Sequence, residues 1–242
     1  MRADQYLTAN GYYDSRARAQ AAIKAGLVSV EGKVVKKPSE KIKEGAVVSA
    51  GHEHPWVSRG GIKLDYALTK FGVDPTGRIA LDVGASTGGF SQVLTTHGIA
   101  KVYAVDVGHG QLHLSLHTHS KIISMEGQDA RTLSPKQFDP TPDLIVCDAS
   151  FISAMKVLET PLGLAAKDAD LITLVKPQFE VGKINIGRGG LVKTEELGLR
   201  ALDRVKHWVR EQGWRCIDSD VSPIRGGSGN TEYLLHAKRS DS

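Results

Sequence analysis

Short apolar runs alternate with helical patterns from residue 79 onward, and this alternation restricts the fold more than any other feature. Between the apolar runs lie stretches such as 195–211, whose leucines and valines recur at helical spacing. Runs that are continuously apolar are typical of parallel strands covered on both faces. The pattern therefore predicts an α/β fold with a doubly wound, Rossmann-like sheet. The expected strands are 79–83, 101–107, 122–125, 144–147, 171–175 and 233–236.

Length and composition exclude several classes of protein. The chain has 242 residues, 40% of them hydrophobic and 24% charged, as in globular proteins and unlike disordered or fibrous ones. No apolar run approaches the roughly 18 residues of a membrane span, and no secretory signal is visible. The two cysteines, Cys147 and Cys216, cannot by themselves form a disulfide framework or a zinc site. We expect a cytoplasmic protein that acts as a monomer, without a metal ion or a membrane.

Positive charge is concentrated at the start of the chain. Residues 1–50 contain nine Lys or Arg against five Asp or Glu, which leaves 22 of each sign for the remainder. A small basic module on a neutral body fits either a polyanion-binding function or a solvated lysine-rich surface. We place this small α+β module at 1–50, a polar linker at 51–57 and the larger module at 58–242.

The basic module has a readable local structure. Ser15 is a suitable N-cap for a helix over 16–25, and Glu31-Gly32 predicts a tight hairpin. The segments DQYL, SRARAQAAIKAGLV and VEGK of this module resemble the S-four RNA-binding domain, which implies contact with structured RNA through the arginine-bearing helix and the hairpin. The candidate RNA-binding residues are Arg2, Arg16, Arg18, Lys24 and Lys33, with Arg59 beyond the linker.

A glycine-rich turn follows the first expected strand, at the edge where such sheets bind ligands. Position 86 is serine, so the turn lacks the glycine spacing of a dinucleotide-binding fingerprint. What remains resembles the first motif of S-adenosylmethionine-dependent methyltransferases. Asp106 and Asp129 follow the next two strands and could accept from the ribose hydroxyls and the adenine amino group, or merely cap helices. The candidate cofactor-binding residues are Asp82, Gly84, Ala85, Ser86, Thr87, Gly88, Gly89, Phe90, Asp106, Val107, Asp129 and Ala130.

Four further charged residues occupy comparable positions. Asp148 and Lys176 end two strands, Glu232 begins the last one, and Lys63 lies just ahead of the sheet. Methyl transfer to a ribose 2′-hydroxyl is an in-line displacement that needs an aligned, deprotonated oxygen. We hypothesise that Lys176 is the general base and that Lys63 supplies a neighbouring positive charge. Asp148 would orient Lys176, and Glu232 would hold Lys63 or the ribose.

In order and context, Lys63, Asp148, Lys176 and Glu232 resemble the K-D-K-E tetrad of FtsJ-type ribose 2′-O-methyltransferases. Together with the S-four segment, nearly the whole chain resembles the TlyA family, also called hemolysin A. The resemblance implies S-adenosylmethionine-dependent 2′-O-methylation of cytidine in ribosomal RNA within ribosomal subunits, and a link to capreomycin and viomycin susceptibility. The ends of the chain resemble the shorter members of the family, which are associated with 23S rather than with both 23S and 16S rRNA.

Two other classes of function are open to test. One is an RNA-binding, ribosome-associated factor without catalysis, and the other is a membrane-active cytolysin, which the absence of an apolar span disfavours. The histidines at 109, 113 and 117 are spaced like a metal pair, but leucines separate them and an ordinary surface is the better interpretation. The loops 186–190 and 225–229 are either RNA or cofactor loops or turns without a ligand.

Overall fold

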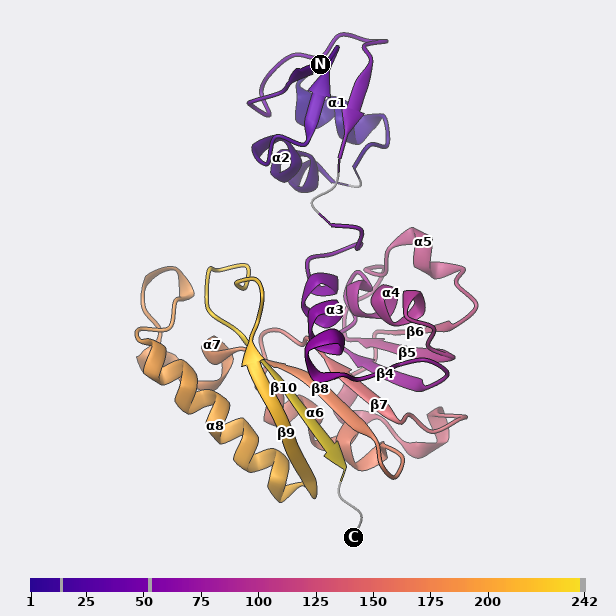
Figure 1. Ribbon diagram of the computed structural model, residues 1–242, viewed down its shortest axis with the longest axis vertical. Coiled ribbons are helices and arrows are strands. Elements are labelled where there is room, and N and C mark those ends of the chain that lie inside the picture. The colour runs from indigo at the N-terminus through magenta and orange to yellow at the C-terminus, as the bar shows by residue number, and fades with distance from the viewer. Residues whose placement is uncertain (14, 52–53, 240–242) are drawn as a thin grey trace. The chain divides into compact units, whose positions relative to one another are not determined.

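The structure, a computed structural model, describes residues 1–13, 15–51 and 54–239 and divides into two compact units, Met1–Pro55 and Trp56–Ser242 (Figure 1). Each unit has its own apolar core, and each is described by itself. Part of the expected linker, positions 52 and 53, lies outside the described residues. The division between the two units falls within the range 51–57.

The first unit packs two helices against a small antiparallel sheet. The hydroxyl of Ser15 accepts a hydrogen bond from the backbone N–H of Arg18 at 3.3 Å, which confirms the expected N-cap. Glu31 and Gly32 both adopt positive φ and close the hairpin that the sequence predicts. The elements are α1 Ala3–Ala9, α2 Arg16–Lys24, β1 Val28–Val30, β2 Lys33–Val34 and β3 Val48–Ala50, with the strand order β2-β1-β3.

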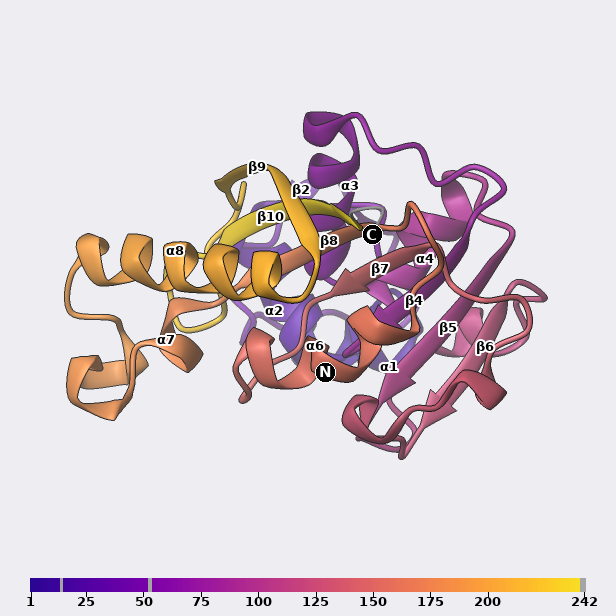
Figure 2. The ribbon, with the colours of Figure 1, turned by 90° about the horizontal axis from the view of Figure 1, so that it is seen from below.

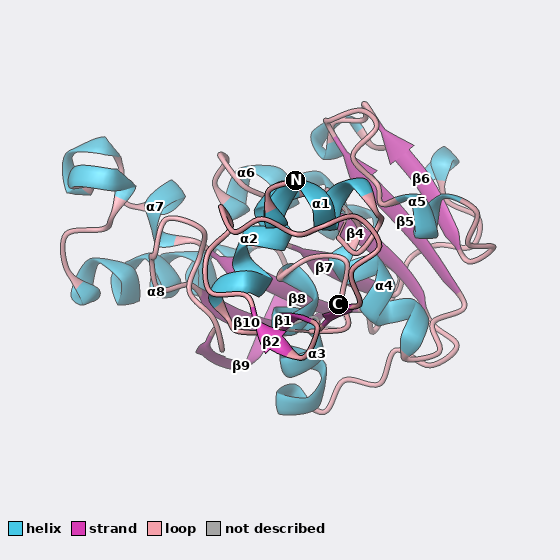
Figure 3. Cartoon of the chain, turned by 90° about the horizontal axis from the view of Figure 1, so that it is seen from above, coloured by secondary structure: helices cyan, strands magenta, loops and turns pink. Residues whose placement is uncertain are grey.

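The second unit is a seven-stranded sheet between helices, in the order β6-β5-β4-β7-β8-β10-β9 (Figures 2 and 3). This arrangement confirms the doubly wound α/β fold. Its strands are β4 Ile79–Val83, β5 Lys101–Asp106, β6 Ile122–Glu126, β7 Leu144–Cys147, β8 Asp170–Val175, β9 Trp214–Val221 and β10 Tyr233–Arg239. Its helices are α3 Gly60–Phe71, α4 Gly89–Thr96, α5 Leu114–His117, α6 Ala154–Leu164, α7 Pro177–Glu180 and α8 Glu195–Glu211.

The sheet is mixed, whereas the sequence led us to expect parallel strands. The neighbouring pairs from β6 to β8 run parallel, but β10 runs antiparallel to both β8 and β9. Sequence analysis did not identify β9, because its apolar residues are interrupted by charged ones in an edge strand. The reversal brings the start of β10 to the edge where the parallel strands end, and Tyr233 pairs with Val175 there.

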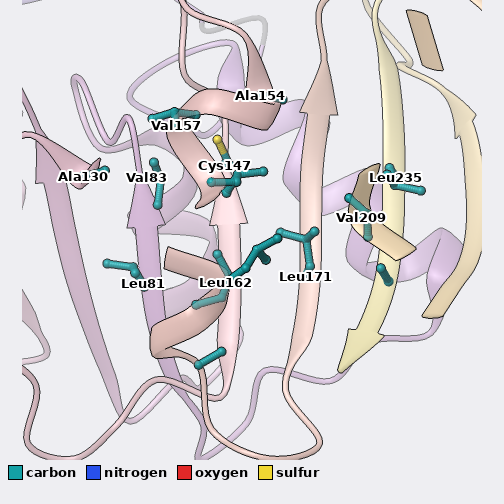
Figure 4. Close-up of a cluster of buried hydrophobic side chains, with 14 of the residues drawn as sticks. Leu81, Val83, Ala130, Cys147, Ala154, Val157, Leu162, Leu171, Val209 and Leu235 are labelled. Atoms are coloured by element: carbon teal, nitrogen blue, oxygen red, sulfur yellow. The ribbon is translucent and has the colours of Figure 1, made fainter. Parts of the chain in front are cut away.

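Two apolar layers cover the two faces of the sheet, because successive residues of a strand point to opposite faces. Leu81 and Val83 lie in the apolar layer that also includes side chains of α6 and α8, shown in Figure 4. Ala80 lies in the other layer, with residues of α3 and α4. With both faces covered, the edge where the parallel strands end is the place for functional side chains.

Candidate active site

The glycine-rich turn between β4 and α4 passes close to the loop that follows β7. Gly84 has φ 81°, and a Cβ added there would lie 2.8 Å from Cα of Ala149. A side chain at this position would therefore be strained by its backbone conformation and would collide with the neighbouring chain. The close approach joins the two loops that border the site.

Asp82, at the end of β4, is fully buried beneath this turn. One carboxylate oxygen accepts a hydrogen bond from the hydroxyl of Ser91 at 2.7 Å, and the other has no partner among the described residues. Burial raises the pKa of Asp82 to about 7. Two cavities lie at this site and are described below, and the side chain of Asp82 lines neither of them. Any contact between Asp82 and a ligand would therefore be made from below the turn.

One cavity of about 540 Å³, which we call the aspartate cavity, contains Asp106, Val107, Asp129 and Ala130 in its wall. Both oxygens of Asp106 accept backbone hydrogen bonds at 2.8 Å, one from Ser86 and one from Gly108. These bonds fix the carboxylate while leaving each oxygen the capacity for a second donor. The position suits recognition of a vicinal diol such as a ribose.

Asp129 lies in the same wall, and its carboxylate is engaged by a neighbour. Its oxygens accept from the side chain of Arg131 at distances down to 2.6 Å and from the backbone N–H of Arg131 at 2.9 Å. The side-chain hydrogen bond from Arg131 lowers the pKa of Asp129. An adenine amino group would share this carboxylate with the guanidinium.

A second cavity, of about 340 Å³, holds all four residues of the predicted tetrad, and we call it the tetrad cavity. The side-chain nitrogen of Lys63 lies 2.6 Å from Glu232 Oε2 and 3.6 Å from Asp148 Oδ2. The side-chain nitrogen of Lys176 lies 2.7 Å from Asp148 Oδ1. The structure therefore joins the four residues in one continuous chain of ion pairs, from Glu232 to Lys176.

The ammonium of Lys176 has two further acceptors. It donates to the backbone oxygen of Asp148 at 3.0 Å and to the hydroxyl of Ser150 at 2.7 Å. The Asp148 carboxylate adds an ion pair, with its Oδ1 2.7 Å from the Lys176 nitrogen. Sequence analysis assigned no role to Ser150, although its place two residues after a strand-end aspartate was a signal.

The loop after β7 separates the two cavities and is held from behind by α7. Glu180 accepts from the Ser153 hydroxyl and from the Ala154 backbone N–H, both at 2.7 Å. Phe151, 92% exposed and at φ 66°, lies with its ring centroid 5.5 Å from that of Phe179. The residues common to both cavities are Gly84, Ser86, Asp148, Ser150 and Phe151.

Of the other predicted residues near the turn, some line the tetrad cavity and others lie outside both cavities. Gly88 lines neither cavity, because Leu112 and Leu116 pack against it. Arg59 lies outside both walls and donates to the backbone oxygen of Arg225. The residues of the turn that line the tetrad cavity are Gly84, Ala85, Ser86, Thr87, Gly89 and Phe90.

In the first unit, Arg2 and Arg16, both predicted to bind RNA, contact the same buried carboxylate. Arg2 and Arg16 donate to the buried carboxylate of Asp4 at 3.0 and 2.9 Å. The side-chain hydrogen bonds from Arg2 and then Arg16 hold the pKa of Asp4 well below its usual range. The side chains of Lys24 and Lys33 are exposed and that of Arg18 is partly exposed.

Other side chains that resembled reactive groups have ordinary environments. Burial raises the pKa of the Cys147 thiol to about 11, so it remains a thiol within the core. His113 is the N-cap of α5, where its ring accepts from the backbone N–H of Ser115. Within the described ranges, no cluster of His, Cys, Asp or Glu could hold a metal ion, and no helix has the length and hydropathy to cross a membrane.

Comparisons with known proteins agree with this architecture. The S4 domain model matches residues 1–48, and the FtsJ-like methyltransferase model matches residues 56–239. The class defined by the fold and site is therefore that of FtsJ-like methyltransferases.

Three relatives show to which family within this class the chain belongs. The 16S/23S rRNA (cytidine-2'-O)-methyltransferase TlyA of Mycobacterium tuberculosis is 42% identical over 97% of this chain and 88% of its own. The 23S rRNA (cytidine-2'-O)-methyltransferase TlyA of Campylobacter jejuni is 40% identical over 75% of this chain and 70% of its own. A solved structure from Streptococcus thermophilus, described as a hemolysin, has TM-score 0.80 and 36% identity and covers 100% of this chain and 89% of that one. This chain belongs to the TlyA family.

S-adenosylmethionine is the methyl donor of this class, and the residues present fit it. The paired backbone donors leave Asp106 able to accept from ribose hydroxyls. The unpartnered buried oxygen of Asp82 and the narrow turn at Gly84 fit the methionine part, which carries an ammonium group.

Proposed function

We propose that the protein methylates the 2′-oxygen of a cytidine ribose in ribosomal RNA. The substrate is 23S rRNA, with 16S rRNA as a second candidate, because both rRNA-modifying relatives name 23S and one of them also names 16S. The observation that carries the proposal is Asp148, which joins both lysines at the wall common to the two cavities. A ribose in the tetrad cavity would meet a methyl donor held in the aspartate cavity.

Each of the four charged residues has its own role in the reaction. Bound S-adenosylmethionine supplies an electrophilic methyl group. In its uncharged amine form Lys176 takes the proton of the 2′-hydroxyl, and Asp148 fixes the direction of its side chain. Lys63, held by Glu232, places a positive charge where the sugar oxygen gains negative charge. Alignment of the oxygen could supply about 7–11 kcal/mol of barrier reduction, more than proton transfer alone.

The glycine-rich turn and the two strand-end aspartates hold the cofactor. Asp106 and Val107 would contact the ribose, Asp129 and Ala130 the adenine, and the residues from Gly84 to Phe90 the methionine part. Asp82 would act from below the turn through its unpartnered oxygen.

We infer further that the first unit binds rRNA and that the protein acts on ribosomal subunits, as a cytoplasmic monomer without a metal ion. Lys24 and Lys33 are exposed and Arg18 is partly exposed, and all three suit phosphate contacts. Arg2 and Arg16 support this surface through Asp4 and keep part of their own side chains accessible. Methylation by this protein would accompany susceptibility to capreomycin and viomycin.

Mapping of 2′-O-methyl marks tests the proposal directly. Each purified ribosomal subunit is incubated with the protein and S-adenosylmethionine, and both rRNAs are then scanned for new marks. We expect a new cytidine mark on 23S rRNA that is absent with the Lys176→Ala protein. Marks that persist with that variant would contradict the assigned base, and binding to subunits without any mark would indicate a non-catalytic factor.

A further inference from the structure

Two surface loops of the second unit carry positive charge without any acid. One is 181–193, between α7 and α8, and the other is 222–231, between β9 and β10. Neither loop contains Asp or Glu, although the larger module as a whole is neutral. Their cations are Lys183, Arg188, Lys193 and Arg225, and all four are exposed.

Asn230 ties the two loops together. Its side chain accepts from the backbone N–H of Val192 and donates to the backbone oxygen of Gly190, both at 2.9 Å. Asn230 is only 5% exposed, so these bonds are shielded from water. Within the first loop, Lys193 also donates to the backbone oxygen of Ile184 at 2.7 Å. The loops therefore form one surface, which we call the loop pair.

The second loop of the loop pair packs against Glu232, a residue of the tetrad. A Cβ added at Gly226 would lie 2.3 Å from Glu232 Oε1, so the second loop packs directly on the carboxylate that holds Lys63. The next two residues, Gly227 and Ser228, line the tetrad cavity. On the other side of the same loop, a cavity of about 350 Å³ includes Lys193 and Arg225 in its wall.

We propose that the loop pair binds the sugar-phosphate backbone of the rRNA strand next to the methylated nucleotide. This inference rests on the proposed function and adds a second RNA contact, separate from the first unit. Cations without neighbouring acids are the usual partners of phosphates, and such contacts position a strand without reading its sequence. Because Glu195 also lines the 350 Å³ cavity, the phosphates contact the exposed cations of the loop pair rather than the interior of that cavity.

The position of the loop pair explains why a phosphate contact is useful here. A ribose can enter the tetrad cavity only if the strand on either side of it crosses the rim of that cavity. The second loop forms part of the rim and packs on Glu232. Binding of the strand to this loop would align the sugar with Lys63 and Lys176.

The test uses the full chain with Lys183→Gln and Arg188→Gln together. Its matched control is Lys167→Gln with Arg215→Gln, which removes the same charges just before β8 and at the start of β9, at the opposite edge of the sheet. At near-physiological salt we expect the KM for large ribosomal subunits to rise about tenfold in the first variant. The affinity for S-adenosylmethionine should stay unchanged, and the control should behave as the unsubstituted protein.

Salt dependence gives a second, independent readout. The slope of log Kd against log salt for protein-free 23S rRNA should become shallower by about 1.4, since each phosphate contact contributes about 0.7 with single-stranded RNA. An unchanged slope, or equal effects of both double variants, would overturn the inference. So would weakened binding to subunits with unaltered binding to protein-free rRNA, because the loops would then contact a ribosomal protein. If the unsubstituted protein left no mark on either rRNA, the proposed function would fail instead.

Discussion

The carboxylate of Asp148 lies between two lysine ammonium groups, with Oδ1 2.7 Å from Nζ of Lys176 and Oδ2 3.6 Å from Nζ of Lys63. Both lysine side chains are only 8% exposed. Buried cations need such compensation, since an unpaired buried charge costs several kcal/mol. The same arrangement presents two positive groups to one cavity, so stability and chemistry depend on a shared carboxylate.

Replacing Lys176 by methionine should greatly slow methyl transfer while leaving the fold intact. Asp148 keeps Lys63 as a partner, so its charge is not left alone. Removing a general base costs about 10²–10⁴-fold in rate. Single-turnover methylation of subunits measures the loss, and isothermal titration with S-adenosylmethionine checks that the cofactor still binds. Lys167→Met is the control, and equal activity of the two variants would exclude Lys176 as the base.

Glu180 should act as a positioning residue for the loop after β7. Glu180→Ala removes both acceptors that hold Ser153 and Ala154, so the loop bearing Asp148 and Ser150 loses its support. We expect kcat to fall about tenfold to a hundredfold with little change in the KM for RNA. Glu180→Gln keeps one acceptor oxygen and should restore most of the rate. A uniform loss in both variants that parallels a loss of folded protein would indicate a purely structural role.

Asp82 should make stability fall as pH rises. Burial raises its pKa from 3.8 to about 7, so between these values the folded protein binds more protons than the unfolded chain. Asp82→Asn removes this penalty. Its gain in the free energy of unfolding, measured by urea denaturation without cofactor, should increase from pH 4 to pH 7 by up to about 4 kcal/mol. Asp168→Asn is an exposed control, and a gain independent of pH would refute the assignment.

In the first unit, substitution of Arg16 should lower stability, whereas substitution of Lys24 should weaken RNA binding. Arg16→Ala removes a partner of buried Asp4, so this unit should unfold at lower temperature. Lys24→Ala leaves that network intact and should weaken rRNA binding with a shallower salt dependence. Thermal unfolding and filter binding on both variants test this contrast. Unchanged melting of Arg16→Ala, or unchanged salt dependence of Lys24→Ala, would contradict the corresponding half.

The positions of six strands along the chain and the edge that carries polar residues could be predicted from the sequence, because apolar runs and the charged residues that end them are local signals. The order of the strands within the sheet and the reversed direction of β10 could not, because pairing joins segments that are distant in the chain. The edge strand β9 could not, since Asp218 and Asp220 interrupt its apolar pattern. The pairing of Arg16 with Asp4 was equally hidden, because a helix arginine on a basic module resembles an RNA contact until its buried partner is seen. Ser150 was missed although it lies two residues after the strand-end Asp148, because serine is common after strands and the hydrogen bond it accepts from Lys176 forms only in the folded protein.

The antiparallel course of β10 has a consequence for biosynthesis. The bond between Lys63 and Glu232 spans 169 positions of the chain, and it forms only after the final strand has inserted beside β8. An incomplete polypeptide still attached to its ribosome therefore has no assembled tetrad. Methyl transfer by the tetrad therefore requires that β10 has already been synthesised and has paired with β8.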